Sequence, residues 1–539
     1  MKRLLVAVLL SLSTHAATQA WCDESPTRPN IVLIMADDMG YSDLGCYGSE
    51  IDTPNLDALA AGGLQFTHFY NTGRCCPSRA ALMTGLYPHQ AGVGHMSKDR
   101  GLPSYRGELG KDTVTIAEVL GAAGYRTMMT GKWHLGWSDY DSPDARGFDR
   151  FYGTRGYIDS YFTVINRTEV YLDDKLLIKP TESPTNRLRP DTVWYTTDVF
   201  TDYAIEFIDE AVERDTPFFL YVAYNAPHFP LHAHKADIAK YRGKFTRGWD
   251  VARRERFERM RRMGLLDRRW KLSPQDSPPW DELSAEEKNE MDFRMAVYAA
   301  IVDRLDQNVG RLVDSLKESG QFDNTVILFL SDNGGSSEVG IFGLRSDTAK
   351  AAAYDQWQRA GGWTSSYGQG WANVSNVPFR MYKRYSHEGG IAAPLIAHWP
   401  AGIESRGTLC HRPAHIIDIM ATCAELARTE YPERFNEHAI TPTEGVSLVP
   451  VFQGRKEAVG REALYWEHEG NRAVRQGKWK LVARHEQPWE LFDMEADRTE
   501  LHDLAAEHPD RVARMVSLYH KWADRAGVVP WGELNKPRK

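Results

Sequence analysis

The sequence predicts an α/β fold whose central sheet is mostly parallel. The first observation is a set of short apolar runs that do not alternate with polar residues, which is typical of strands buried on both faces. The second is that helical patterns lie between these runs along the 539-residue chain. Alternation of strands and helices indicates a parallel sheet with helices packed on it.

Five apolar runs are the predicted strands, and three clear helical patterns lie between them. The predicted strands lie within residues 28–38, 125–136, 216–230, 324–335 and 393–400. The helical patterns cover residues 56–63, 114–124 and 296–320. Most of the strand runs end in charged or polar residues. The candidate catalytic and binding side chains are therefore expected at the carboxyl ends of the strands, where open α/β sheets bind ligands.

The chain divides into three predicted parts. Residues 1–20 have a basic start, a short apolar run and small residues before the expected cleavage point, which predicts an export signal peptide. Residues 27–455 form the predicted α/β domain. From residue 456 to residue 539 the pattern changes to short strands with tight turns and one amphipathic helix, which predicts a small α+β domain with an antiparallel sheet.

Composition restricts the possible partners and compartments. The net charge of -8 argues against a nucleic-acid partner, and no other apolar run is long enough to cross a membrane. The signal peptide predicts a periplasmic or secreted protein in a bacterium, and a lysosomal or secreted one in a eukaryote. Such compartments permit disulfides, for which Cys410 and Cys423 are a candidate pair among six cysteines.

Two segments have the composition of insertions. Residues 235–292 are rich in Arg and Glu, and the favoured interpretation is a solvated charged helix. Residues 340–377 are rich in Gly, Ser, Trp and Tyr, which suits either a loop over a site or a passive surface loop. Four aromatic residues there are candidates for stacking on a substrate ring, or for anchoring the loop itself. They are Trp357, Trp363, Tyr367 and Trp371.

Two acidic pairs follow two of the predicted strands. Asp37 and Asp38 come after the first strand, and Asp332 and Asn333 after the fourth. If these strands are parallel, three carboxylates and one amide converge, which is costly unless a cation neutralises them. Oxygen ligands without thiolate or imidazole select a hard cation, Ca²⁺ or Mg²⁺. The alternative interpretation is that each pair caps the helix that follows it.

Basic residues follow the other strands. Lys132 and His134 lie in the segment GKWHLG, His228 in NAPHFP, and Lys383 in RMYKRYSHEGG. Lysine holds anionic groups, and histidine exchanges protons near neutral pH. Each of these residues alone is a weak signal, but their repeated position after apolar strands predicts an anion-binding site.

The segment NTGRCCPSRAALMTG, residues 71–85, places two adjacent cysteines at a predicted helix start. Pro77 suits the first turn of a helix, and Gly85 is a natural stop. The helix N-terminus lowers the pKa of a thiol, and Arg79 adds positive charge, so a reactive cysteine facing an anionic substrate is one interpretation. A buried pair of thiols, a disulfide between Cys75 and Cys76, and a metal site are the alternatives.

These segments resemble the type I, formylglycine-dependent sulfatases, and most of all the bacterial arylsulfatases. Residues 75–79 followed by Thr84 and Gly85 match the family signature C-x-P-S-R…T-G, and further matching blocks follow in order over nearly the whole chain. The resemblance implies an alkaline-phosphatase-like α/β domain with a small C-terminal domain. It implies hydrolysis of sulfate esters, either aryl sulfates or sulfated carbohydrates, with one Ca²⁺ ion rather than Mg²⁺.

The resemblance also assigns the nucleophile and the metal ligands. It implies that a maturation enzyme oxidises Cys75 to formylglycine, whose hydrate attacks the substrate. Leu86 stands where many members carry an arginine that aids this conversion. The implied metal ligands are an oxygen on residue Cys75 together with Asp37, Asp38, Asp332 and Asn333.

The remaining site residues take roles from the same resemblance. Arg79 and Lys132 correspond to residues that stabilise the hydrate, and His134 to the one that helps deprotonate it. His228 and Lys383, with Lys132, correspond to the groups that bind the sulfate and the leaving oxygen. The alternatives are a phosphonate monoester or phosphodiester hydrolase of the same superfamily and an inactive glycan-binding homologue.

Overall fold

A computed structural model describes residues 28–534 apart from a few gaps, which are residues 167, 181, 339, 345–364 and 456–459. The predicted signal peptide, Trp357 and Trp363 lie outside the described residues.

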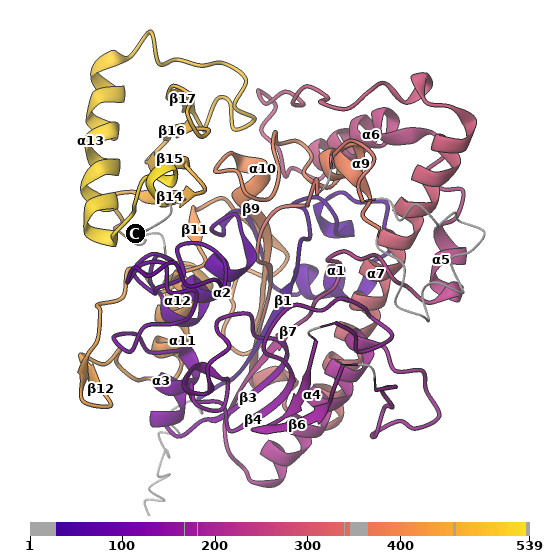
Figure 1. The fold of residues 1–539 in the computed structure, drawn as a ribbon, viewed down its shortest axis with the longest axis vertical. Coiled ribbons are helices and arrows are strands. Elements are labelled where there is room, and N and C mark those ends of the chain that lie inside the picture. The colour runs from indigo at the N-terminus through magenta and orange to yellow at the C-terminus, as the bar shows by residue number, and fades with distance from the viewer. Residues whose placement is uncertain are drawn as a thin grey trace, which may run out of the picture.

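One large sheet lies at the centre of the described chain (Figure 1). Its strands are β1 (Asn30–Ala36), β2 (Leu64–Tyr70), β3 (Arg126–Lys132), β4 (Arg150–Thr154), β5 (Val170–Leu172), β6 (Lys175–Ile178), β7 (Phe218–Ala223), β8 (Thr325–Ser331), β9 (Ala392–His398), β10 (Thr408–Cys410) and β11 (Ala414–His415). They follow the order β10-β2-β9-β8-β1-β7-β3-β4-β5-β6, and β11 pairs with β2.

The predicted mostly parallel sheet is confirmed. Strands β8, β1, β7, β3 and β4 are parallel to one another, and β10 and β11 are parallel to β2. Strand β9 is antiparallel to both of its neighbours, and the edge strands β5 and β6 are antiparallel too. All five predicted strands form.

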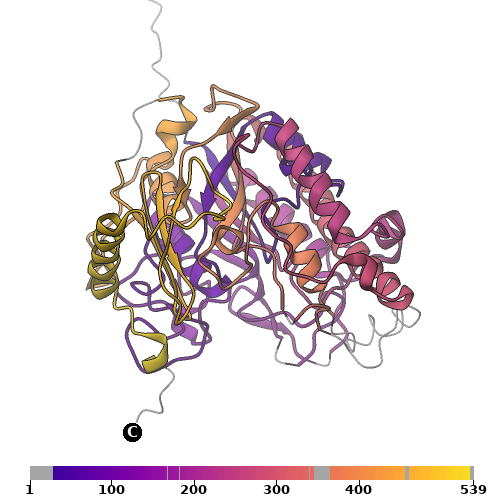
Figure 2. The same cartoon turned by 90° about the horizontal axis from the view of Figure 1, so that it is seen from above.

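Helices cover both faces of this sheet. Their bounds are α1 (Pro54–Ala61), α2 (Cys75–Thr84), α3 (Ile116–Ala122), α4 (Thr196–Glu213), α5 (Lys235–Tyr241), α6 (Gly248–Arg262), α7 (Ala285–Glu318), α9 (Gly368–Ser375), α10 (Glu388–Ile391), α11 (Asp418–Leu426) and α12 (Val449–Phe452). Helices α1, α4, α5, α6 and α7 share one apolar core, and α2, α3, α11 and α12 share the other. Figure 2 shows the sheet between these two layers.

The central strand β1 explains why the sequence pattern is continuous rather than alternating. Val32, Ile34 and Ala36 belong to one core, and Ile31 and Leu33 belong to the other. Every residue of β1 is buried, because a helix layer covers each face. The apolar run is therefore a consequence of burial on both sides.

Strand β2 is fully buried although its sequence, LQFTHFY, mixes polar and apolar residues. Its polar side chains have internal partners: Gln65 donates a hydrogen bond to the Cys46 carbonyl, and the Thr67 hydroxyl lies 2.9 Å from His411 Nδ1. Because these partners are distant in sequence, the pattern alone does not indicate a buried strand here.

The C-terminal part of the chain forms a separate antiparallel sheet with a helix beside it, as Figure 1 shows at the upper left. The strands are β14 (Leu464–His468), β15 (Asn471–Gln476), β16 (Trp479–Ala483) and β17 (Glu490–Asp493), followed by helices α13 (Pro509–Ala526) and α14 (Trp531–Leu534). These elements are the ones predicted for residues 456–539. The exact domain boundary stays a prediction, since it falls on residues that are not described.

The interpretation of residues 235–292 as a solvated charged helix is wrong for the inner face of α6. Arg256 has no exposed side-chain surface and donates to Asp43 Oδ1 at 2.8 Å and to Glu50 Oε1 at 2.9 Å. Arg253 is also buried and donates to the Ser273 carbonyl. Arg253 and Arg256 of α6 therefore donate hydrogen bonds inside the protein. The high content of charged residues alone does not show which face of this helix is buried.

The segment 340–377 is in part a helix and not a loop. Helix α9 places Trp371 in a buried cluster with Trp249 and Trp280. Tyr367 stacks on Tyr298 with ring centroids 4.4 Å apart. Both Tyr367 and Trp371 thus anchor this segment internally and are not available for stacking on a substrate.

The candidate disulfide does not form. All five cysteines in the described residues are free thiols, so Cys410 and Cys423 do not form a disulfide, and neither do Cys75 and Cys76. Within the described residues, we find no helix with the length and apolar character needed to span a membrane.

Replacing Arg256 by methionine is expected to destabilise the fold. The substitution leaves the buried carboxylate of Asp43 without its cation, which costs about 3 to 5 kcal/mol of unfolding free energy. Arg254 lies on the exposed face of α6, and Arg254→Met is the matched control, with an effect within about 0.5 kcal/mol. Urea denaturation measures both, and equal stabilities of the two variants would contradict the internal role of Arg256.

Candidate active site

The two acidic pairs meet because β1 and β8 are adjacent and parallel. The register pairs Ala36 with Ser331, so both strands end at the same level of the sheet. Asp37 and Asp38 follow β1, and Asp332 and Asn333 follow β8. All four side chains are buried. The convergence predicted from the sequence is therefore present.

These four residues contact one another directly. The Asp38 amide donates to Asp332 Oδ1 at 3.2 Å, and Asn333 Nδ2 donates to Asp38 Oδ1 at 2.7 Å. Asp38 has a φ of 66°, a left-handed conformation that non-glycine residues rarely adopt. Strain of this kind persists where the surrounding structure fixes a functional side chain.

Three buried cations surround the carboxylates. Lys132, at the end of β3, places Nζ 2.5 Å from Asp37 Oδ2. Arg79, on α2, places Nη2 2.8 Å from Asp332 Oδ2 and 3.5 Å from Asp37 Oδ2. Lys383 places Nζ 2.8 Å from Asp38 Oδ1. Each carboxylate therefore has a cationic partner from a different segment of the chain.

The pKa values of the Asp37 and Asp332 carboxyls are shifted in opposite directions. Burial opposes ionisation of Asp37, but Lys132, His228 and Arg79 hold its pKa well below the usual range. Burial and the charge of Asp37 raise the pKa of Asp332 well above its usual range. Ionising several adjacent buried carboxyls is costly unless a cation is present, so this arrangement indicates a cation site.

Two oxygens in this cluster support the same conclusion. Asp37 Oδ1 and Asn333 Oδ1 are buried and have no hydrogen-bond partner within the described residues. Buried polar atoms are normally paired, so an orphaned oxygen needs another partner. Carboxylate and amide oxygens are the ligands that hard cations such as Ca²⁺ prefer. The residues present therefore fit a hard metal ion.

Helix α2 places Cys75 at its first position, with Arg74 as the N-cap and Gly85 as the left-handed C-cap. The predicted helix start and stop are confirmed. The cysteine side chain is buried, and its Sγ lies within 4.8 Å of Cys76 Sγ and of a ring nitrogen of His134. The Cys76 hydrogen bond and the charge of Lys132, acting against burial, hold the pKa of the Cys75 thiol well below its usual range.

His134 lies beside Cys75 in an unusual backbone conformation, with a φ of 60°. Burial and the Lys132 charge lower its pKa to about 4, so its ring is neutral at pH 7 and can accept a proton. Its Nδ1 has no partner within the described residues. The neutral imidazole therefore has a nitrogen lone pair available to accept a proton next to residue 75.

His228 and Lys383 complete the site on its other side. The Nδ1 of His228 contacts the Phe229 carbonyl, which orients the ring as an Nδ1–H donor. Its Nε2 then lies 3.4 Å from Asp38 Oδ2 and 3.3 Å from Lys383 Nζ. All of the residues predicted from the sequence for catalysis and metal binding thus belong to one buried cluster.

Two further residues of this cluster, Glu338 and Arg74, were not predicted from the sequence. Glu338 lies 3.9 Å from Lys383 Nζ and 2.7 Å from Arg74 Nη1. The charges of Lys383 and Arg74 overcome the effect of burial and hold the pKa of Glu338 at about 2. Arg74 directly precedes Cys75 and could have been noticed there, but Glu338 follows no strand directly and has no sequence signal.

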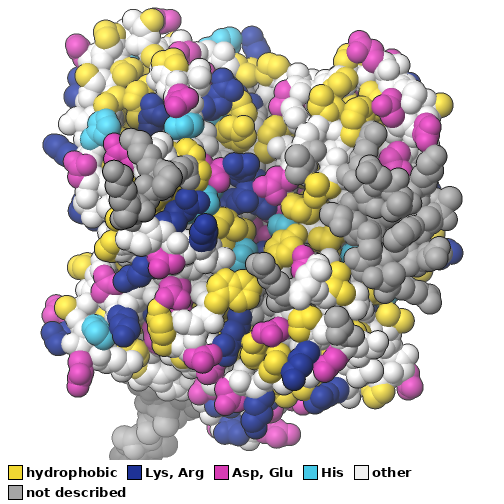
Figure 3. All heavy atoms as spheres, in the orientation of Figure 1, with side chains coloured by type: hydrophobic (Ala, Val, Ile, Leu, Met, Phe, Trp, Pro, Cys, Tyr) yellow, Lys and Arg dark blue, Asp and Glu magenta, His cyan; other side chains and the backbone are white. Residues whose placement is uncertain are grey.

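The cluster opens to one face of the molecule. In Figure 3, Lys and Arg side chains gather around a hollow near the middle of this face. The cavity that opens there is lined by Lys383 and Glu338 on one side and by turns of the C-terminal sheet on the other. An anionic group entering this hollow meets positive charge first.

Family models match nearly the whole chain. The model described as Sulfatase matches residues 29–429. The model described as N-sulphoglucosamine sulphohydrolase, C-terminal, matches residues 379–521.

Individual relatives match over similar lengths. An uncharacterized sulfatase of Schizosaccharomyces pombe is 32% identical over 93% of this chain and 94% of the relative. An arylsulfatase of Klebsiella aerogenes is 31% identical over 82% of this chain and 94% of the relative. The solved structure of Ps i-CgsB has 30% identity and a TM-score of 0.67, covering 92% of this chain and 93% of that one.

Proposed function

The chain belongs to the sulfatase family and is a sulfuric ester hydrolase, and we propose that it acts through an aldehyde made from Cys75 beside a calcium ion. The observation that supports this proposal best is the position of Cys75. It begins helix α2, contacts a neutral histidine and faces the oxygen cluster and its cations. A maturation enzyme would convert this cysteine to formylglycine before the protein can act.

The nucleophile is a hydroxyl of the hydrated aldehyde. Its oxygen attacks the sulfur of the ester while its proton passes to a carboxylate of the adjacent acidic cluster, and the bond from sulfur to the leaving alcohol oxygen breaks. Lys132 and Lys383 neutralise the sulfate oxygens, whose charge rises in the transition state. Arg79, already bonded to Asp332, holds the acidic cluster in place around residue 75.

Two histidines move the protons. The Nε2 of His228 faces Lys383 and Asp38 and is positioned to protonate the leaving alcohol. His134 then removes the proton from the second hydroxyl of the hydrate. The bond from carbon to the sulfate oxygen breaks, sulfate leaves and the aldehyde forms again. A serine sulfate ester lacks this second hydroxyl and has no such route.

The proposed calcium ligands are the four oxygen-bearing residues of the cluster and residue 75. When bound, calcium polarises the sulfate ester and stabilises negative charge on oxygen. Asp37 Oδ1 and Asn333 Oδ1, which accept no hydrogen bond from any described residue, supply two of the ligand positions. Calcium is proposed over magnesium because the cluster provides many protein oxygens, whereas magnesium usually keeps several waters.

The proposed substrates are aryl sulfates or sulfated carbohydrates. The K. aerogenes relative is named an arylsulfatase, and Ps i-CgsB has been solved in complex with k-i-k-neocarrahexaose. Export from the cytoplasm, as the leader sequence predicts, would bring the enzyme to such extracellular material.

Replacing Cys75 by alanine tests the nucleophile. Turnover of 4-nitrophenyl sulfate should fall by about a thousandfold or more, since the attacking group is removed. Cys76→Ala is the matched control and should retain turnover, because Cys76 takes no chemical step. Equal activity of the two variants would contradict the assignment, and faster wild-type hydrolysis of phosphonate or phosphate esters would contradict sulfate-ester specificity.

Removing calcium tests the metal site. EGTA should abolish turnover and Ca²⁺ should restore it, and Ca²⁺ at 100 times its Kd should stabilise the folded protein by about 2.7 kcal/mol. Asp332→Asn should lose this stabilisation while Asp323→Asn, an exposed control, keeps it. A calcium-dependent thermal shift of equal size in both variants would place the ion elsewhere.

Replacing His228 by alanine tests the proton donor. An alkyl or sugar alcohol is a poorer leaving group than 4-nitrophenolate and needs protonation more. The variant should therefore lose about 10² to 10⁴ in kcat on an alkyl sulfate but far less on 4-nitrophenyl sulfate. Equal losses on the two esters would show that His228 does not protonate the leaving oxygen.

A further inference from the structure

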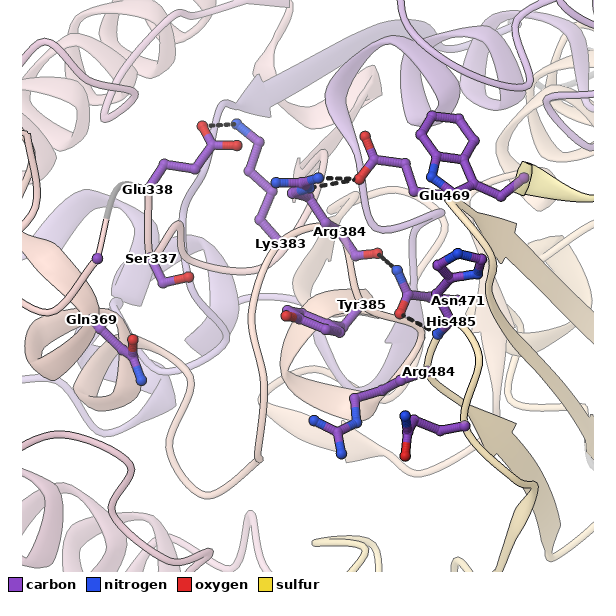
Figure 4. Close-up of a pocket in the computed structure, with 13 residues that line it drawn as sticks. Ser337, Glu338, Gln369, Lys383, Arg384, Tyr385, Glu469, Asn471, Arg484 and His485 are labelled. Carbon is purple, nitrogen blue, oxygen red and sulfur yellow. Dashed lines mark hydrogen bonds and ion pairs between the residues drawn. The ribbon is translucent and has the colours of Figure 1, made fainter. Parts of the chain in front are cut away.

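A cavity of about 700 Å³ adjoins the catalytic lysine and extends beyond it. One wall contains Lys383, Arg384 and Tyr385, and the other is made by two turns of the C-terminal sheet (Figure 4). The turn between β14 and β15 supplies Glu469, and the turn after β16 supplies Arg484. The volume is that of a ligand-sized pocket and exceeds the needs of a single sulfate group.

The acidic side chains of the cavity are already neutralised. Glu338 is paired with Arg74 and Lys383. Glu469 accepts from His95 at 3.0 Å and from Arg384 Nε at 2.7 Å. Burial opposes the ionisation of Glu469, but these partners hold its pKa well below the usual range. Neither carboxylate leaves unbalanced negative charge in the cavity.

Arg484 is a cation of the cavity lining that takes no part in these ion pairs. Its side chain is exposed, and its guanidinium makes no hydrogen bond or ion pair within the described residues. Figure 4 shows it directed into the opening, away from Lys383 and Glu338. Its charge lowers the pKa of Glu490, but that carboxylate is already bound by His387 and lies close to Arg380.

The rest of the lining suits a carbohydrate. Asn471, Gln487 and Gln369 offer amide groups to hydroxyls, and Tyr385 offers a ring face. Trp531 adds an indole ring, so the lining combines polar groups with aromatic surface, a combination that suits the hydroxyls and the faces of sugar rings. This mixed lining, with the Arg484 guanidinium unpaired within the described residues, points to an anionic sugar as the ligand.

Resting on the proposed function, we propose that this cavity is a subsite for an anionic oligosaccharide, in which Arg484 binds a second anionic group on the sugar next to the sulfated one. The guanidinium fork is suited to a sulfate or a carboxylate, each of which it binds through two parallel hydrogen bonds. The preferred substrate is then a glycan with charges on adjacent sugars, and a simple aryl sulfate uses only the catalytic end.

Calorimetric binding to lactose derivatives tests this subsite. The probes carry one sulfate, one sulfate on each ring, or one sulfate and a carboxylate on the other ring. The Cys75→Ala background prevents turnover, and calcium is present throughout. Arg484→Gln should weaken binding of both doubly charged probes by about tenfold or more, the value of a charge-assisted hydrogen bond, and leave the singly charged probe within about twofold.

Arg514→Gln is the matched control, because Arg514 is exposed on α13 outside the cavity. It should leave all three affinities unchanged. Equal affinity of the parent protein for singly and doubly charged probes, or equal losses in the Arg484 and Arg514 variants, would overturn the proposal. Loss with only one of the two doubly charged probes would identify sulfate or carboxylate as the preferred group.

An activity assay distinguishes failure of the subsite proposal from failure of the proposed function. With Cys75 intact, Arg484→Gln should hydrolyse 4-nitrophenyl sulfate at the wild-type kcat/KM, since that ester has one anionic group. A wild-type enzyme without sulfatase activity would contradict the proposed function and leave the binding result to be judged separately. A loss of kcat on 4-nitrophenyl sulfate would contradict the assignment of Arg484 to a remote subsite.

Discussion

The structure depends on the cost of burying like charges at the ends of two parallel strands. The register of β1 and β8 forces the carboxyls of Asp37, Asp38 and Asp332 together, where they cannot all be ionised without cations. The sheet supplies these cations from other segments, with Lys132 at the end of β3 and Arg79 on α2. The same arrangement that balances the charge also forms the site that we propose for a metal ion and a sulfate group.

A second buried charge network fixes the C-terminal sheet to this core. Glu388, on α10, is bound by Lys480 of β16 at 2.8 Å and by Arg498 at 2.7 Å, and Lys480 also reaches Glu500 at 2.8 Å. These side chains have no exposed surface. Removing one member of such a network is costly, so β16 and the turn after it, which carries Arg484, are held in a defined position at the wall of the cavity.

Sequence reasoning succeeded where a signal is local. Residues at the ends of apolar strands, such as Asp37 and Lys132, were predicted to lie together, and they do, because parallel topology makes strand ends converge. It failed where a partner is distant in sequence. Arg256 was predicted to be solvated, but it is buried against Asp43 and Glu50. Glu338 joins the site through its ion pair with Arg74, which no sequence pattern indicates. Strand β2 was missed for the same reason, since its polar residues are satisfied across the fold.

The central claim is that residue 75 acts as an aldehyde and not as a thiol. The direct measurement is the mass of the peptide that carries Cys75, taken on preparations with different specific activities towards 4-nitrophenyl sulfate. The account predicts that activity rises in proportion to the fraction of peptide that has lost the thiol sulfur and gained the aldehyde oxygen. Full activity in a preparation whose peptide retains the unmodified cysteine mass would contradict it.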